Sequence, residues 1–234
     1  MSVLNITEVN ITANIPDNLR FAIISDLHNF ANELVLNTIS LINPDGVLVA
    51  GDYIHSNHIF QNGLEFLRQS AKSYPTFCSL GNHESRFSGD IRKLTDDTEA
   101  ILLDNGYINF SGIKIGGLTS GQFYKNKGYI PELNWLCDFS AQPGFKLLLC
   151  HHPEYFNKYI KDTNVDLTVS GHAHGGQWRL FNRGFYSPGQ GIFPKYTSGL
   201  YENRLLVSRG IGNQSAIPRI NNNPEVICLN IIPE

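Results

Sequence analysis

The chain has 234 residues, of which 41% are hydrophobic and 17% charged, and its formal net charge at pH 7 is −3. A chain of this length buries roughly 70% of the surface that its unfolded form exposes, so one sizeable core and a single domain over residues 1–234 are expected. The slight negative charge disfavours specific nucleic-acid binding, which needs a basic surface. The four cysteines form no C-x-x-C pair, which argues against a zinc knuckle and favours a reducing compartment.

The amino terminus and the hydropathy pattern predict a cytoplasmic protein. Residues 1–16, MSVLNITEVNITANIP, have neither a basic start nor a continuous apolar run, so no secretory signal is expected. A spanning helix needs about 18 consecutive apolar residues, and the sequence contains no such run. We therefore expect no transmembrane segment, while peripheral contact with a membrane stays open.

Short apolar runs that alternate with helical periodicity predict an α/β fold. Helices are expected at residues 32–42 and 59–71, and a hairpin at 101–120, where Asn-Gly and Ser-Gly turns separate alternating residues. Strands are expected at residues 20–25, 46–50, 75–80, 145–150, 165–170, 199–208 and 225–232. Because a hairpin interrupts the alternation of strands and helices, we expect two packed mixed β-sheets with helices outside, not one doubly wound parallel sheet.

Side chains of metal-binding type follow five of the predicted strands. They are Asp26 and His28, then Asp52, then Asn82, His83 and Glu84, then His151 and His152, and last His172 and His174. Since the carboxyl ends of strands in an open α/β sheet face one crevice, these groups are expected to meet there. Carboxylates, an amide oxygen and imidazoles, without a thiolate, suit Mn²⁺, Fe or Zn²⁺ in a catalytic site. Seven ligands are too many for one tetrahedral ion, which indicates two ions sharing Asp52, roughly 3.5–4 Å apart, as in phosphate-ester hydrolysis.

The order D-x-H, G-D, G-N-H-E, H and G-H-x-H across residues 26–174 resembles the calcineurin-like metallophosphoesterase superfamily. Within it, GHAHGGQ at 171–177 is similar to a bacterial branch with the motif G-H-T-H-G-G-Q, although Ala173 replaces the threonine. That branch includes membrane-associated phosphoesterases, some acting on lipid-linked diphosphates. The resemblance implies a four-layer αββα sandwich and a metal-dependent phosphohydrolase that cleaves phosphomonoesters or phosphodiesters.

The family pattern implies a role for each motif residue. One ion takes Asp26, His28, Asp52 and His174, and the other takes Asp52, Asn82, His151 and His172. A hydroxide that bridges the two ions attacks phosphorus, and His83 acts as the general acid for the leaving group. The expected partner is a small phosphorylated substrate, and the expected cofactors are the two metal ions alone.

Ordinary roles exist for these residues when each is taken singly. An aspartate after a strand is often a helix N-cap, and Asn82 fits a turn. We expect His152 to support or border the site, and Glu84 to make a structural hydrogen bond. His55 and His58 are expected on a solvated loop. For Arg86, Arg209 and Arg219, binding of a substrate phosphate is an alternative, but exposed positions are favoured.

Other interpretations stay open at this point. Residues 182–202 fit a long surface loop and a wall of the substrate site equally well. Hydrolysis of a nucleotide-sugar lipid diphosphate is an alternative within the same chemistry. A non-catalytic scaffold on the same fold belongs to a different class, and the complete set of motif residues disfavours it.

Overall fold

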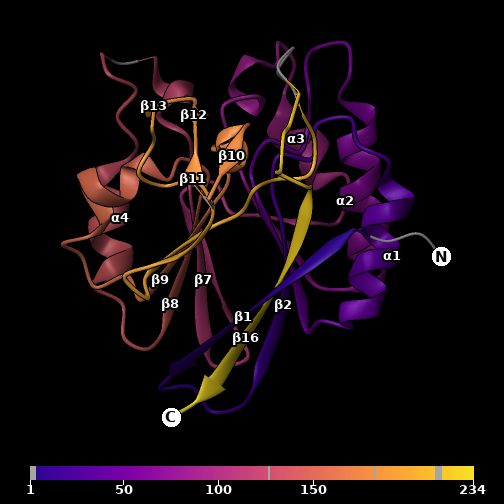
Figure 1. The fold of residues 1–234 in the computed structure, drawn as a ribbon. Helices are drawn as coiled ribbons and strands as arrows, with labels where there is room; N and C mark the ends of the chain where they lie inside the picture. The colour runs from indigo at the N-terminus through magenta and orange to yellow at the C-terminus, as the bar shows by residue number, and fades with distance from the viewer. Residues whose placement is uncertain (1–3, 126, 182, 214–217) are drawn as a thin grey trace.

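The computed structural model describes residues 4–125, 127–181, 183–213 and 218–234. Two six-stranded mixed sheets pack face to face, and helices lie on the outer side of each sheet (Figure 1). This arrangement confirms the predicted α/β fold with two packed mixed sheets between helices.

The first sheet has the strand order β1-β16-β2-β3-β4-β5. Its strands are β1 (Asn5–Ala13), β2 (Leu19–Ile24), β3 (Gly46–Ala50), β4 (Thr76–Ser79), β5 (Ile101–Leu102) and β16 (Glu225–Pro233). Strands β2 to β5 run parallel, whereas β16 pairs antiparallel with β2 and parallel with β1. On its outer side lie α1 (Asn32–Ile42), α2 (Gln61–Ser73) and α3 (Ile91–Asp96) (Figure 1).

The second sheet has the order β14-β15-β9-β8-β7-β6. Its strands are β6 (Gly106–Phe110), β7 (Ile113–Leu118), β8 (Lys146–Cys150), β9 (Leu167–Ser170), β14 (Gly199–Tyr201) and β15 (Leu205–Val207). The four central strands run parallel, and β6 and β14 close the edges antiparallel. The helix α4 (Leu133–Ser140) covers its outer side (Figure 1).

Short elements complete the chain between these layers. Two hairpins follow β9, namely β10 (Arg179–Leu180) with β11 (Arg183–Gly184), and β12 (Tyr186–Ser187) with β13 (Gly191–Ile192). Single helical turns lie at η1 (Glu84–Arg86), η2 (Gly121–Tyr124), η3 (Phe156–Ile160) and η4 (His174–Gly176).

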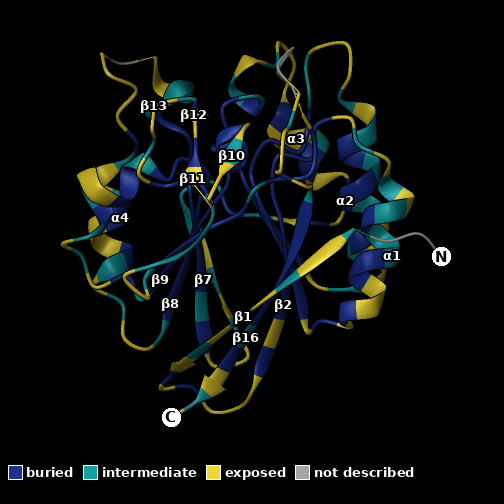
Figure 2. Ribbon diagram, viewed as in Figure 1, coloured by how far each residue is buried: buried dark blue, intermediate teal, exposed yellow. Residues whose placement is uncertain are grey.

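The core explains why the central strands read as continuous apolar runs. Along β2, Phe21 and Ile23 face the second sheet, while Ala22 and Ile24 pack beneath the helices. Because both faces are covered, the strand has no water-facing side and carries no polar alternation. Figure 2 shows the result, with buried central strands and exposed positions on the outward faces of the helices.

Two sequence expectations need correction. Residues 199–208 form two antiparallel strands, β14 and β15, because Glu202 and Asn203 adopt φ of 52° and 51° and reverse the chain. The hairpin predicted over 101–120 is confined to β6 and β7, and the segment Ile101–Leu102 instead joins β4 in the first sheet.

Candidate metal centre

Loops after the parallel strands of both sheets meet at one end of the sandwich. The amide of Asp26 donates to Gly51 O at 3.2 Å, and the amide of His28 donates to Asp52 O at 3.2 Å, so the loops after β2 and β3 are joined. In the second sheet, Gly171 N–H donates to His151 O at 3.1 Å. Two further contacts join the loops of one sheet to those of the other across more than a hundred positions of the sequence: His172 N–H donates to Asp26 Oδ2 at 3.0 Å, and His151 Nδ1 is 2.8 Å from Ala50 O.

One group of candidate ligands consists of Asp26, His28 and His174. All three are buried, and one nitrogen or carboxylate oxygen from each lies within 4.8 Å of the others. His174 Nε2 is 3.4 Å from Asp26 Oδ1. The rings of His28 and His174 are stacked with centroids 5.4 Å apart. This is the set that the sequence assigns to the first ion, apart from the shared Asp52.

The second group consists of Asp52, His151 and His172, and again their ligand atoms lie within 4.8 Å of one another. His151 Nε2 is 3.1 Å from Asp52 Oδ2. Asp52 also lies within the same distance of His28 and His83. It therefore stands between the two groups, which is the position that a shared carboxylate needs.

Asn82 completes the predicted set at the end of β4. Its side-chain oxygen is buried and accepts no hydrogen bond from the residues that the structure describes. A buried amide oxygen without a donor is costly in a folded protein, and a cation satisfies it. Six of the seven predicted ligands thus lie in the two groups, Asn82 follows β4 at the same end, and these oxygen and imidazole donors fit divalent metal ions.

The backbone at this site is unusual. Positive φ angles occur at five of the seven predicted ligands, namely Asp26 (50°), His28 (52°), Asp52 (54°), His172 (65°) and His174 (45°). Residues other than glycine rarely adopt this left-handed conformation, and such strain gathers at functional sites.

The G-H-A-H-G-G segment is not extended. In an extended chain, residues at i and i+2 such as His172 and His174 would lie on one face, but the intervening Ala173 is helical, with φ −77° and ψ −14°. The two histidines still face different groups, His172 that of Asp52 and His174 that of Asp26. Ala173 is fully buried and packs in the apolar cluster outside the second sheet.

Burial and mutual charge set the protonation of these groups. Burial lowers the pKa of His28 to about 3, and it holds the pKa of His172 well below the ordinary value. Burial alone would lower the pKa of His151, but the adjacent Asp52 raises it to about 10. For Asp52, burial acts upward, yet His151 keeps its pKa well below the ordinary value. Asp52 is therefore ionised, and His28 and His172 are neutral. These are the states in which carboxylates and imidazoles bind metals.

His83 lies at the border of the site. Its Nδ1 is 2.6 Å from His55 O, and because a carbonyl oxygen only accepts, Nδ1 carries a hydrogen. Its Nε2 is 3.9 Å from Asp52 Oδ2, and its side chain is 15% exposed. His83 is thus held in one orientation beside the two groups. His55 helps to hold it and lies 5.9 Å from the His28 ring, so the expectation of a merely solvated loop is wrong for His55.

Several supporting contacts surround the ligands. Glu84 accepts hydrogen bonds from three backbone N–H groups, as expected of a structural residue. His152 is buried against the His172 ring, with centroids 4.5 Å apart. Its Nε2 is 2.8 Å from Ser120 Oγ, and its Nδ1 is 3.4 Å from Glu154 Oε1. Nothing in the sequence signals Ser120 or Glu154, because both belong to common residue types without a motif.

The three arginines expected at the surface differ in the structure. Arg86 is exposed. Arg209 is paired with Glu225 at 2.5 Å. Arg219 is partly buried beside the site, and its Nη2 is 3.4 Å from His174 Nδ1. For Arg209 and Arg219 the expectation of exposure is therefore wrong.

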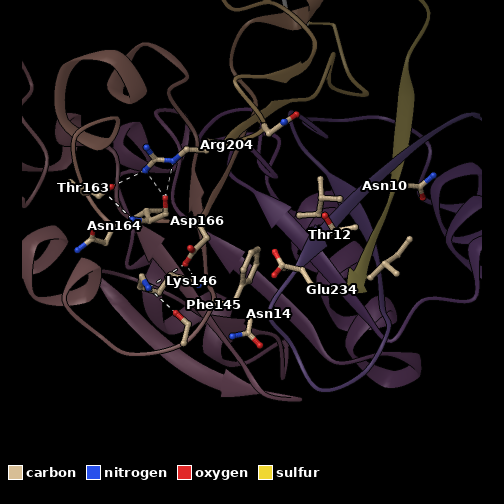
Figure 3. Close-up of a pocket in the computed structure, with 16 residues that line it drawn as sticks. Asn10, Thr12, Asn14, Phe145, Lys146, Thr163, Asn164, Asp166, Arg204 and Glu234 are labelled. Carbon is tan, nitrogen blue, oxygen red and sulfur yellow. Dashed lines mark hydrogen bonds and ion pairs between the residues drawn. The ribbon is translucent and has the colours of Figure 1, made fainter.

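A cavity of about 870 Å³ lies at the opposite end of the sandwich. Its lining includes Lys146, at the start of β8, whereas His151 follows the last residue of that strand. Five strand residues at about 3.3 Å each separate the two ends by roughly 16 Å. Figure 3 shows this lining, with the hydrogen bonds of Arg204 to the carbonyl oxygens of Thr163 and Val165. None of the predicted ligands lines this cavity.

The αββα sandwich with clustered metal-type ligands at its strand ends defines the class of protein. A family profile described as calcineurin-like phosphoesterase matches residues 19–176. The chain belongs to the calcineurin-like phosphoesterase family.

Relatives of this chain are found in several bacteria. It is 29% identical to an uncharacterized metallophosphoesterase, Cj0846, of Campylobacter jejuni, over 93% of this chain and 60% of that protein. It is 30% identical to an uncharacterized metallophosphoesterase, YkuE, of Bacillus subtilis, over 82% and 69% of the two chains. It is 26% identical to the phosphodiesterase YaeI of Escherichia coli, over 81% and 71%. The chain spans about 60% of the length of its Campylobacter and Helicobacter pylori relatives.

The fold is shared with solved structures. The calcineurin-like phosphoesterase YfkN from Bacillus subtilis superposes with a TM-score of 0.52 at 14% identity, covering 83% of this chain and 82% of that one. Among the described residues, no helix is both long and apolar enough to cross a membrane.

Proposed function

We propose that the protein is a metal-dependent phosphoester hydrolase with two ions at the candidate metal centre, and that it acts on phosphodiesters or phosphomonoesters. The convergence of six of the predicted ligands from four strand ends, with Asp52 between two groups, carries the proposal. The buried side-chain oxygen of Asn82, which has no hydrogen-bond donor among the described residues, supports it. The name of the E. coli relative, a phosphodiesterase, supports the diester reaction.

The proposed division of the ligands between the two ions follows the assignment made from the sequence. Asp26, His28 and His174 would hold one ion, and Asn82, His151 and His172 would hold the other, with Asp52 shared. Bound ions of the Mn, Fe or Zn type would supply positive charge against the phosphate and would lower the pKa of a bound water from 15.7 to about 7. Because the ligands are buried, bulk water is kept away from that charge, and its attraction for phosphate is stronger.

His83 has the geometry of a general acid. The hydrogen bond from Nδ1 to His55 O fixes the ring and turns Nε2 toward the metal groups. In the imidazolium form, Nε2 carries the proton that is given to the leaving oxygen. A positioned acid of this kind accelerates such reactions by about 10²- to 10⁴-fold.

Metal reconstitution tests the proposal. Protein stripped with a chelator is supplied with Mn²⁺, Fe²⁺ or Zn²⁺ and assayed with p-nitrophenyl phosphate, bis-p-nitrophenyl phosphate and nucleotide-sugar diphosphates. We expect about two ions per chain and hydrolysis that depends on them. Absence of hydrolysis with every ion on a broad panel would support a scaffold instead.

Substitution of His83 tests the assignment of the acid. We expect His83→Asn to retain both ions and to lose about 10²- to 10⁴-fold in kcat. The matched control is His58→Asn, because His58 is exposed and belongs to neither ligand group. Turnover of His83→Asn equal to that of the control, at full metal content, would refute the role of His83.

A further inference from the structure

Exposed apolar side chains gather on the two short hairpins after β9. Seven of the eighteen exposed large hydrophobic residues in the described part of the chain lie between residues 178 and 193. Phe181 is 90% exposed, Phe193 75%, Leu180 67% and Ile192 64%. We call the exposed side chains of residues 178–193 the hairpin surface; Asn182 lies outside the described residues. A concentration of this kind is typical of an interaction site, since single exposed apolar residues are normally scattered.

The hairpin surface is continuous. The rings of Trp178 and Phe185 are stacked with centroids 5.9 Å apart, and Phe185 meets Phe193 at 5.3 Å. The amide of Phe193 donates to Phe185 O at 2.8 Å, which joins the second hairpin to the first. Figure 2 shows exposed positions on β10, β11 and β13, at the end of the molecule away from the C-terminus.

The segment of residues 167–201, which carries the hairpin surface, has positive formal charge, whereas the whole chain is slightly negative. The chain has 21 acidic residues and a net charge of −3, yet residues 167–201 contain no aspartate or glutamate. The same stretch contains Arg179, Arg183 and Lys195. Glu154, which lies under Gly189, is mostly buried and faces His152. The hairpin surface therefore combines aromatic side chains with an excess of positive charge.

The hairpins are attached directly to the candidate metal centre. Arg179 Nη1 donates to Gly175 O at 2.7 Å, and the amide of Phe185 donates to Gly176 O at 3.0 Å. Both carbonyl groups belong to the segment that carries His172 and His174. A partner that contacts the hairpins therefore lies at the same end of the sandwich as the predicted ligands.

We propose that the hairpin surface docks on a lipid bilayer that contains anionic lipids. Aromatic side chains prefer the boundary between headgroups and acyl chains, and arginine and lysine are attracted to anionic headgroups. The exposed cations Arg183 and Lys195 beside exposed rings favour such a surface over a neutral apolar partner. Docking in this way needs no spanning helix and directs the metal centre toward the bilayer surface.

Sedimentation with vesicles tests the proposal without any assay of catalysis. The full chain is mixed with vesicles of phosphatidylcholine alone or with 40% phosphatidylglycerol, a composition chosen to set the surface charge. We expect binding to the anionic vesicles that weakens as salt is raised, because counterions screen the headgroups. We expect Leu180→Ser/Phe181→Ser to weaken that binding at least about tenfold, since its apolar contact is lost.

Matched variants separate the hairpin surface from general effects. Leu41 on α1 is 63% exposed, close to the 67% of Leu180, so Leu41→Ser is the apolar control. Arg183→Gln is expected to weaken binding about fivefold, whereas Lys93→Gln, an exposed cation on α3, should not. Activity on a soluble phosphodiester should be unchanged in Leu180→Ser/Phe181→Ser, which shows that the variant is folded.

Three results would overturn the proposal. The first is equal binding of wild type and Leu180→Ser/Phe181→Ser to anionic vesicles, and the second is no binding by either protein. The third is a wild-type dimer in light scattering that this variant dissociates without any vesicle binding, because the hairpin surface would then be an interface between copies of the chain.

Discussion

Glu84 offers a sharp test of how the candidate metal centre is built. Its side chain is 1% exposed. One carboxylate oxygen accepts from Asp52 N–H at 2.9 Å and Gly81 N–H at 2.8 Å, and the other accepts from Ile54 N–H at 3.0 Å. It thereby joins the loop after β3 to the loop after β4 and holds the backbone of Asp52. Glu84→Ala would leave three buried N–H groups without an acceptor.

The expected loss follows from these three bonds. An orphaned buried N–H costs about 1–3 kcal/mol, so three cost roughly 3–9 kcal/mol. Part of this is offset, because burial and the nearby Asp52 raise the pKa of Glu84 to about 8, a sign that the carboxyl is itself unfavourably placed. We expect Glu84→Ala to lower the free energy of unfolding by about 3–5 kcal/mol. Glu84→Gln can keep the two bonds to its oxygen and should lose about 1–3 kcal/mol.

Urea unfolding followed by circular dichroism, with a chelator present, measures this loss apart from metal binding. The matched control is Glu65→Ala on α2. Glu65 also makes hydrogen bonds, to Arg68 and Gln69, but they lie at the surface. Its removal should change the free energy of unfolding by less than about 0.5 kcal/mol. If the loss in free energy of unfolding for Glu84→Ala were within about 1 kcal/mol of that for the control, Glu84 would not brace these loops.

Two further predictions concern packing and metal content. A Cβ at position 63 would lie 2.0 Å from Tyr53 O. We therefore expect Gly63→Ala to lower the free energy of unfolding by about 2 kcal/mol or more, although alanine normally stabilises a helix. Gly106→Ala meets no heavy atom within 4 Å and is the control in urea titrations; an equal effect of both changes would contradict the packing. Elemental analysis should find that Asp52→Asn loses both ions, whereas Asn82→Ala loses one; equal loss in the two variants would argue against a shared carboxylate.

The central strands and the position of the site are predictable because they depend on local patterns. The predicted bounds of β3 and α1 agree with the structure, since a buried apolar run and a helical apolar stripe are visible within a few residues. The strand ends then bring the motif residues together by topology alone. The assignment of each ligand to an ion stays a prediction, although the structure groups six of the seven side chains in the same way.

Features that depend on distant partners are not predictable in this way. Strand β1 pairs with β16, placing Asn5 opposite Glu225, and most of its positions are exposed or half-buried, so no strong apolar period marks it. The turn that divides residues 199–208 needs positive φ at Glu202 and Asn203, and glutamate is a poor signal for that conformation. The support of His152 by Ser120 depends on contact between residues 32 positions apart.

Hydrogen bonds to Asp26 and Asp52 hold the loops in which the ligands adopt left-handed backbone conformations. Each left-handed residue other than glycine costs on the order of 1 kcal/mol, so these loops need fixed partners. Asp26 supplies one by accepting from His172 N–H at 3.0 Å. Asp52 supplies another, because its Oδ1 accepts from His83 N–H at 2.8 Å while its Oδ2 faces His151.

Each aspartate therefore braces a neighbouring loop. In Asp52 the oxygen that does so is distinct from the one that faces His151. Because Asp52 Oδ1 accepts from the backbone, Oδ2 remains directed at the ligand groups. The same side chain therefore orders a loop and directs negative charge at the candidate metal centre. An aspartate-to-asparagine change at either position removes charge but keeps an acceptor for the backbone. It should therefore impair metal binding more than folding, which separates the two duties of these residues in a way that alanine cannot.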